Sequence, residues 1–426
     1  MFPSSHARAS ARRFPFGAAT AALALFAASP LAAQDLGLSD VLARASRADP
    51  SQEVTGARVA AGEASIRQAE VGPRPVIGVD VEDFAGTGPY SPVDRSQTTA
   101  WYERTWERGG KREARIGAAR AELSAVALRG RLRTLDYLAQ VQTAWVEALA
   151  AQAAVTIADE RLAFAERNAR DIGYRVDRAI DPLFADERAR TAVAQARIAL
   201  DQARETARIA RASLAAFWGG SEAFGLDLAP FQALAPVAYE AADMPDLALL
   251  AAERDTADAR VRLEEARSVA DPTLRAGVRH FGQGNEVALV VGGSIPLGSR
   301  SANRANVERA RSERGAADAE IAVARLERQR EIDRLSAERR AVAAEIGRID
   351  REMLPGAERS VAMIRTGFNR GGTAFTLLEL AEAQRVVTDA RARRIELLRR
   401  FHLGGVRLDR LTGRHLSLVA SAENRR

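Results

Sequence analysis

The chain has 426 residues, of which 28% are charged and 5% are aromatic, and it contains no cysteine. The lack of cysteine excludes a disulfide framework, a thiol nucleophile and a lipid-modified N-terminal cysteine, whereas a composition rich in Ala, Arg, Glu and Leu is typical of long helices. The formal net charge is +6, but the arginines are interspersed with acidic residues, so the charge does not indicate a nucleic-acid partner.

The N-terminal segment 1–33 has the features of a secretory signal peptide. Three arginines precede an apolar run that ends in small residues, and the pattern predicts cleavage after Ala33. A transmembrane anchor is the alternative, but Pro30 and the shortness of the apolar run argue against it. No later stretch is apolar for about 20 residues, so we expect an exported chain that could enter a membrane only through β-strands.

The mature sequence contains an internal repeat. Residues 110–122 align with 301–313, and further landmarks recur in the same order, which indicates two copies of one unit of about 190 residues. The expected divisions are the signal peptide 1–33, repeat 1 at 34–218, a linker at 219–244, repeat 2 at 245–414 and a C-terminal tail at 415–426.

Each repeat is predicted to contain a helix, two strands, a long helix, a tight turn and a final helix. In the first repeat the helices and strands are expected at 38–70, 76–84, 97–107, 111–175 and 183–218, and in the second at 246–269, 273–282, 286–296, 301–366 and 374–412. Apolar residues recur about every 3.5 positions along both long helices, from Leu128 to Leu149 in the first and from Leu335 to Met353 in the second. This is the coiled-coil period, and it predicts that both stripes are core residues. We therefore expect a mainly α fold in which two shorter helices accompany each long one.

The predicted strands alternate between apolar and polar residues. In the first, Ile77, Val79 and Val81 alternate with Gly78, Asp80 and Glu82. One apolar and one polar face is what a wall between lipid and a water-filled lumen requires, although a sheet of a protein outside the membrane is the alternative. Four strands are too few to close a barrel across a membrane, so several chains are expected to share one β-barrel.

Two stretches carry a resemblance to a known family, ERGGKREARIGAARAE at 107–122 and LLELAEAQR at 377–385. With the duplication, the strand placement and the helix lengths, the whole mature chain resembles the TolC-type outer-membrane efflux family. The two stretches are most similar to its CzcC-like branch, which serves heavy-metal efflux. Gly109 and Gly110 would then form the hinge where a barrel strand becomes a tunnel helix, because glycine tolerates backbone conformations that a Cβ forbids.

The resemblance also implies the assembly and its partners. It implies a homotrimer whose strands form one β-barrel in the outer membrane of a Gram-negative bacterium, and whose coiled-coil helices form an α-helical barrel across the periplasm. The expected partners are outer-membrane lipid, a periplasmic adaptor (a membrane fusion protein) and an inner-membrane pump of the resistance-nodulation-division type, with no nucleic acid.

The same resemblance places a gate and the adaptor contact at the two turns, 173–182 and 367–373. Carboxylate rings narrow a pore and attract cations, so the gate candidates are the acids in or after the turns, although acids near helix N-termini also have a structural role. These candidates are Asp181, Asp186, Glu187, Glu379 and Glu382. The candidates for adaptor contact are Gly173, Tyr174, Arg175, Gly367, Phe368 and Asn369.

The sequence predicts neither a catalytic site nor a resident metal or cofactor. No hydrolase, metalloprotease or phosphate-loop motif is present, and the three histidines after the signal peptide, His280, His402 and His415, are not at metal-ligand spacing. Three functions remain open at this point: a duct for heavy-metal efflux, a duct for multidrug efflux or type I protein secretion, and a periplasmic coiled-coil scaffold that never enters a membrane.

Overall fold

The computed structural model describes residues 35–90, 93–235, 244–369 and 376–418. The predicted signal peptide lies outside the described residues, as do residues 236–243 of the predicted linker and 419–426 of the predicted tail. In the described part, no helix has both the length and the apolar character needed to cross a membrane.

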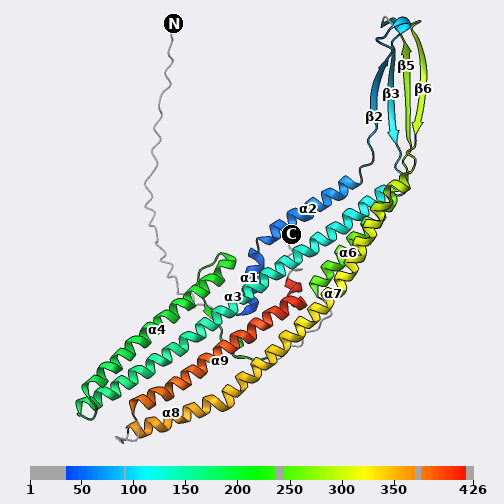
Figure 1. The fold of residues 1–426 in the computed structure, drawn as a ribbon. Helices are drawn as coiled ribbons and strands as arrows, with labels where there is room; N and C mark the ends of the chain where they lie inside the picture. The colour runs from blue at the N-terminus through cyan, green and yellow to red at the C-terminus, as the bar shows by residue number, and fades with distance from the viewer. Residues whose placement is uncertain (1–34, 91–92, 236–243, 370–375, 419–426) are drawn as a thin grey trace, which may run out of the picture. The chain divides into compact units, whose positions relative to one another are not determined.

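Long helices make up most of the described chain (Figure 1). Helix α3 (Lys111–Asp177) has 67 residues, which corresponds to about 100 Å at ~1.5 Å per residue. The other helices are α1 (Leu38–Ala48), α2 (Ser51–Ala69), α4 (Leu183–Ala215), α5 (Ala229–Gln232), α6 (Pro245–Arg267), α7 (Ser299–Arg348), α8 (Leu354–Asn369) and α9 (Leu377–Thr412).

Two shorter helices accompany α3, as the sequence predicted. Helix α2 packs on the first part of α3, where Gly130 lies against Thr55, and α4 packs on the later part, where Arg197 pairs with Glu166. Helix α9 contacts α3 as well as α7 and α8, so the helices of the two predicted repeats share one packed layer (Figure 1).

The apolar stripe of α3 forms the core of this layer. Leu135, Leu138, Val141, Trp145 and Leu149 are all buried, which confirms the predicted core face. The matching stripe of the second repeat is buried at Leu335, Val342, Ile346 and Ile349, but Met353 is 46% exposed. Its prediction as a core residue was therefore wrong.

A π-helical turn explains the exposure of Met353. The predicted helix 301–366 consists of α7, the π turn η4 (Ile349–Met353) and α8. Pro355 lacks an N–H group, and just before it the N–H of Leu354 bonds to the carbonyl of Ile349, five residues back. The wider turn shifts the helical phase, so the stripe no longer faces the core at Met353.

The predicted helix 38–70 is also divided. Asp49 has an extended backbone. Its carboxylate accepts two hydrogen bonds from Ser51, one from the backbone N–H at 2.8 Å and one from the side-chain hydroxyl at 2.9 Å. Proline disfavours the helical conformation of the residue before it, so α1 ends before Pro50 and a separate helix, α2, begins after it.

The four predicted strands form one antiparallel sheet in the order β2-β3-β5-β6. The strands are β2 (Val76–Glu82), β3 (Gln97–Thr105), β5 (Thr273–Phe281) and β6 (Glu286–Ser294). β3 pairs with β5, so strands from the two predicted repeats are neighbours in the centre of the sheet.

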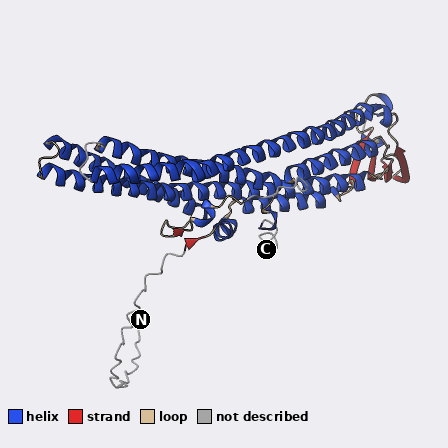
Figure 2. Ribbon diagram, turned by 90° about the horizontal axis from the view of Figure 1, so that it is seen from below, coloured by secondary structure: helices blue, strands red, loops and turns tan. Residues whose placement is uncertain are grey.

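Short elements that the sequence did not predict lie beside the helices (Figure 2). β1 (Asp35–Leu36) pairs in parallel with β4 (Gly225–Leu226), and Phe231 of α5 is fully buried, so part of the predicted linker is structured. Away from the helices, η1 (Gly88–Tyr90) and η2 (Val93–Arg95) lie between β2 and β3, and η3 (Ala216–Trp218) follows α4.

Candidate functional site

The register of the sheet separates an apolar face from a charged face. Ile77, Val79 and Val81 share one face with residues of β5 and β6 such as Val278 and Leu289. These side chains are exposed, by 62% at Val79 and 84% at Leu289. The predicted alternation is confirmed, and the apolar face is uncovered in a single chain.

An arginine cluster occupies the charged face. Arg275 of β5 pairs with Glu103 of β3 at 3.2 Å and with Asp80 of β2 at 3.4 Å, and its guanidinium lies 3.8 Å from the ring centroid of Trp101. Arg279 pairs with Glu82 at 2.9 Å. The sequence predicted a polar face but not these pairs, because the partners come from strands far apart in the chain.

The junction between β3 and α3 depends on two glycines. Gly109 and Gly110 have φ angles of 72° and 69°, in the left-handed region that residues with a Cβ avoid. A Cβ at Gly109 would lie 2.6 Å from the Cβ of Val269 and 3.2 Å from the carbonyl oxygen of Ala266. The structure thus places the predicted hinge glycines at a turn where the chain passes close to the end of α6.

Charged side chains fasten this junction. Lys111 pairs with Asp271 at 2.6 Å, and Asp271 also accepts the backbone N–H of Arg108 at 2.9 Å. Arg115 pairs with Glu107 and donates to the carbonyl oxygens of Ala69 and Val71, at the end of α2. The hydrogen bond from Arg115 lowers the pKa of Glu107 below its ordinary value, although burial opposes this shift.

Acidification is expected to weaken the junction through Glu107. Because the folded pKa of Glu107 is lowered, its stabilising effect is fully present above the unfolded pKa of about 4.3 and is lost as the pH falls through the folded pKa. The loss should be roughly 1–3 kcal/mol, the size of a hydrogen bond to a charged group. Thermal unfolding of the wild type and of Glu107→Gln, measured below about pH 5, should show a flatter pH dependence in the variant.

Arg115→Gln is the matched variant for this titration, because it removes the hydrogen bond that lowers the pKa of Glu107. It should flatten the pH dependence as Glu107→Gln does. The same pH slope in Glu107→Gln and in the wild type would contradict the assignment.

At the other end of α3, Arg175 connects the two predicted turns. Its guanidinium binds both oxygens of Asp181, at 2.7 and 3.1 Å, and donates to the carbonyl oxygen of Phe368 at 3.4 Å. It also lies 4.6 Å from the ring centroid of Phe368, which is buried. The hydrogen bonds to Asp181 raise the pKa of Arg175 above its ordinary value, so the guanidinium remains charged.

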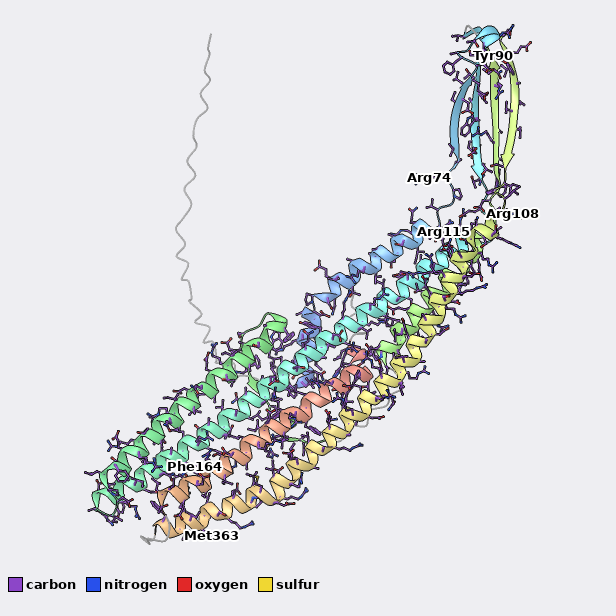
Figure 3. The ribbon with its side chains drawn as sticks, viewed as in Figure 1. Arg74, Tyr90, Arg108, Arg115, Phe164 and Met363 are labelled. Atoms are coloured by element: carbon purple, nitrogen blue, oxygen red, sulfur yellow. The ribbon has the colours of Figure 1, made fainter. Side chains whose placement is uncertain are left out.

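A groove of about 1090 Å³ opens beside this contact, between α3, α4 and α9. Arg175, Asp181 and Phe368 line one end of it, and Phe164 of α3, labelled in Figure 3, lies in its wall. The groove is mostly apolar but has polar groups at Asn168 and Gln384, whose side chains bond to each other at 2.8 Å.

The gate candidates differ in their surroundings. Asp181 is bound to Arg175, and Asp186 pairs with Arg190 at 2.7 Å. The carboxylate of Glu379 accepts the N–H of Thr376 at 2.6 Å in a capping box, which is the structural alternative considered for such acids. Glu187 and Glu382 are exposed, and neither has an ion pair with another described residue.

The adaptor-contact candidates are only partly accessible. Tyr174 is 56% exposed and stacks with Arg178 at 4.0 Å, but Phe368 is buried under Arg175. Gly173 lies near Asp186, and Gly367 is half-buried in α8. The side chain of Asn369 and residues 370–373 of the second predicted turn lie outside the described residues.

Arg391 is a connecting residue that sequence reasoning missed. It lies on α9 and pairs with Glu160 of α3 and, at 2.7 Å, with Glu358 of α8. In a chain with so many arginines no local pattern distinguishes it, so only the packing of the three helices identifies it.

The histidines do not converge. Burial lowers the pKa of His402, which donates to the carbonyl oxygen of Phe231 at 2.8 Å, and His415 lies near Gln142 and Asp409. Within the described ranges, no group of three or more His, Cys, Asp or Glu side chains is arranged to hold a metal ion.

Comparison with known proteins gives consistent matches. A family profile described as outer membrane efflux protein matches residues 240–414. The chain is 29% identical over 364 residues to the cobalt-zinc-cadmium resistance protein CzcC of Cupriavidus metallidurans, covering 83% of this chain and 84% of that relative. It is 30% identical over 342 residues to the nickel-cobalt-cadmium resistance protein NccC of Alcaligenes xylosoxydans xylosoxydans, covering 78% and 75% of the two chains.

Solved structures match over a similar length. The outer membrane protein VceC of Vibrio cholerae superposes with a TM-score of 0.70 at 17% identity, covering 88% of this chain and 96% of that chain. At this identity the likeness shows the fold alone, and it confirms a mainly helical chain with a small sheet.

Proposed function

Because the chain belongs to the outer membrane efflux protein family, we propose that it is the outer-membrane duct of a tripartite efflux system that exports heavy-metal cations. This family comprises efflux channels and not enzymes, in agreement with the prediction that the chain has no catalytic site. The protein is accordingly assigned to the outer membrane, with its helices extending into the periplasm.

The observation that carries the proposal is the two-faced sheet. Its apolar face is exposed, its opposite face is charged, and strands of nine residues such as β3 and β5 suit a membrane span. Strands β2 and β6 are the edges of the sheet, and open edges are not tolerated in lipid. Three copies joined edge to edge would close one barrel, so the homotrimer is part of the proposal.

The relatives support the choice of cargo. CzcC and NccC are named for resistance to cobalt, zinc, cadmium and nickel, and we assign divalent cations of these metals as the cargo of this chain. The cations would pass through the duct, driven by the inner-membrane pump. Selection among them would then belong to the pump and not to the duct.

The gate and the adaptor contact are proposed for the turns at the far end of α3. The acids Asp181, Asp186, Glu187, Glu379 and Glu382 would attract cations at the mouth of the trimer, with the exposed Glu187 and Glu382 the most available. A periplasmic adaptor would contact the same end near Tyr174 and Gly367, and it would link the duct to a pump of the resistance-nodulation-division type. The groove beside Arg175 supports this placement, because it offers an apolar hollow next to the turns.

A deletion strain tests the proposed function. Loss of the gene should lower growth on graded zinc, cadmium, cobalt, nickel and copper, because the pump would then lack an exit through the outer membrane. A panel of dyes and antibiotics run in parallel should show no change. Restoration by the intact gene, with the trimer detected in detergent extracts of outer membranes, completes the measurement.

Each other outcome corresponds to one of the alternatives. Sensitivity to organic compounds alone would contradict metal efflux and support a drug-efflux duct, and no sensitivity to either panel would favour protein secretion. Recovery of the chain only in the periplasmic fraction, without detergent, would support the scaffold.

A further inference from the structure

Three exposed arginines lie at one edge of the sheet, where edge now means a row of strand ends and not the edge strands β2 and β6. Because the strands are antiparallel, the start of β2, the end of β3, the start of β5 and the end of β6 all lie at the edge that joins the helices. Arg74 precedes β2, Arg108 follows β3 and Arg300 follows β6. All three are exposed, and Figure 3 shows Arg74 and Arg108 at this edge, whereas Tyr90 lies at the opposite one.

The side chains of these arginines are not used in the ion pairs that stabilise the junction. Among the described residues, none of the three side chains has an ion-pair partner, whereas Lys111 and Arg115 at the same edge are paired with Asp271 and Glu107. Arg300 lies in the first turn of α7, where a positive charge opposes the helix dipole. Helix stability therefore does not explain its presence there.

The opposite edge of the sheet has the opposite character. Glu82 ends β2 and pairs with Arg279, Asp83 begins the loop after β2, and Glu286 begins β6. Arg95, in the turn before β3, is an exposed arginine at this second edge. Unpaired positive charge is thus concentrated at the edge that joins the helices.

The arginine edge is continuous with the apolar face. Trp106, directly after β3, is 40% exposed, and Arg104, which shares the apolar face, has its guanidinium 5.6 Å from the Trp106 ring centroid. Tryptophan near a membrane boundary lies at the level of the lipid head groups, and an arginine on the lipid side extends its charge toward them.

We propose that Arg74, Arg108 and Arg300 bind the phosphates of anionic phospholipid head groups in the leaflet that faces the periplasm. The proposal rests on the duct function, since it requires the apolar face to lie in lipid. The guanidinium is the side chain best suited to phosphate, because its planar N–H groups bind two oxygens at once. In a trimer, the three arginines of each chain would form a positive girdle around the barrel at the depth where these phosphates lie.

The test compares the affinity of the reconstituted protein for two lipids. The full mature chain, and the triple variant Arg74→Gln/Arg108→Gln/Arg300→Gln, are assembled in vesicles of phosphatidylcholine with or without phosphatidylglycerol. Electron paramagnetic resonance of spin-labelled lipids then gives the association of phosphatidylglycerol relative to phosphatidylcholine. The wild type should prefer phosphatidylglycerol. In the triple variant the ratio of the two association constants should fall at least about fivefold, the factor expected for one basic residue at a membrane surface.

Arg95→Gln is the matched control, because it removes an exposed arginine from the opposite edge of the same sheet, and it should keep the wild-type preference. High salt should weaken the preference of the wild type, since it screens exposed charges. Size-exclusion chromatography in detergent checks that the triple variant still assembles.

Two contrary results are distinguishable. A wild type that inserts and conducts without preferring phosphatidylglycerol, or a triple variant that keeps the preference, would overturn the head-group proposal and leave the duct intact. A wild type that enters neither kind of vesicle would overturn the duct, and with it the proposal that depends on it.

Discussion

Replacing Gly109 with valine is expected to prevent most of the chain from reaching the outer membrane as an assembled trimer. The φ angle of 72° is strained for a β-branched residue, and the added Cβ would lie 2.6 Å from that of Val269. Backbone strain and overpacking together should cost roughly 2–6 kcal/mol. The measurement is the amount of trimer in outer-membrane fractions, with the thermal stability of any protein recovered.

Two other glycines separate the causes of this loss. Gly110 has a similar φ of 69°, but a Cβ there would meet only Glu113 at 3.9 Å, so Gly110→Val should show the strain without the clash. Gly117 lies inside α3, and no atom beyond its chain neighbours and the backbone of its own helix lies within 4 Å of an added Cβ, so Gly117→Ala should stabilise the helix by about 0.5–1 kcal/mol. Wild-type amounts of Gly109→Val in the membrane would contradict the hinge.

The long helices and the faces of the strands could be predicted because they depend on periodicity. An apolar residue at every second position fixes which side chains share a face, so the alternation of Ile77, Val79 and Val81 gave the faces of β2 correctly. Likewise, the absence of proline from 111–175 was enough to predict one long helix.

The breaks within the predicted helices were harder to predict, although the prolines that cause them are visible in the sequence. Pro50 and Pro355 both lie inside patterns that read as continuous helix, and the backbone accommodated them differently: α1 ends before Pro50, whereas a π turn allows the helix to continue past Pro355. Which solution occurs depends on tertiary packing. At Pro50 the carboxylate of Asp49 accepts the N–H of Ser51, the first residue of α2, and at Pro355 the helix remains packed on α9.

Sequence reasoning named residues at both turns but not the contacts between them. Asp181 and Arg175 were both named, as gate and adaptor residues, yet they bind each other, and Arg175 also contacts Phe368, which is 193 positions away. Phe368 cannot be identified as this partner from local patterns, because it is distant in the sequence. The ion pairs are equally ambiguous, because the chain has 62 basic and 56 acidic residues from which many pairs could form. Only the packing of α8 against α9 and of α9 against α3 brings the two turns together.

Replacing Arg175 with alanine is expected to release the two turns from each other. The variant loses the bidentate contact with Asp181, whose side chain is only 20% exposed, and the stacking on Phe368. Together these should be worth about 2–4 kcal/mol of local stability. Backbone amides at the end of α3 and the start of α4 should then exchange hydrogen roughly 100-fold faster, and the reconstituted channel should open more often.

Two variants test whether this effect is specific to Arg175. Arg190 pairs with Asp186 at 2.7 Å, but it is 69% exposed, so Arg190→Ala should change local stability by less than about 1 kcal/mol. Arg175→Lys keeps the charge but loses the planar two-point contact, and it should fall between alanine and the wild type. Equal exchange rates in Arg175→Ala and Arg190→Ala would contradict this role of Arg175. They would show that the apolar packing of Phe368 and Leu380 alone holds the turns. The gate would then have to be sought among the exposed acids Glu187 and Glu382.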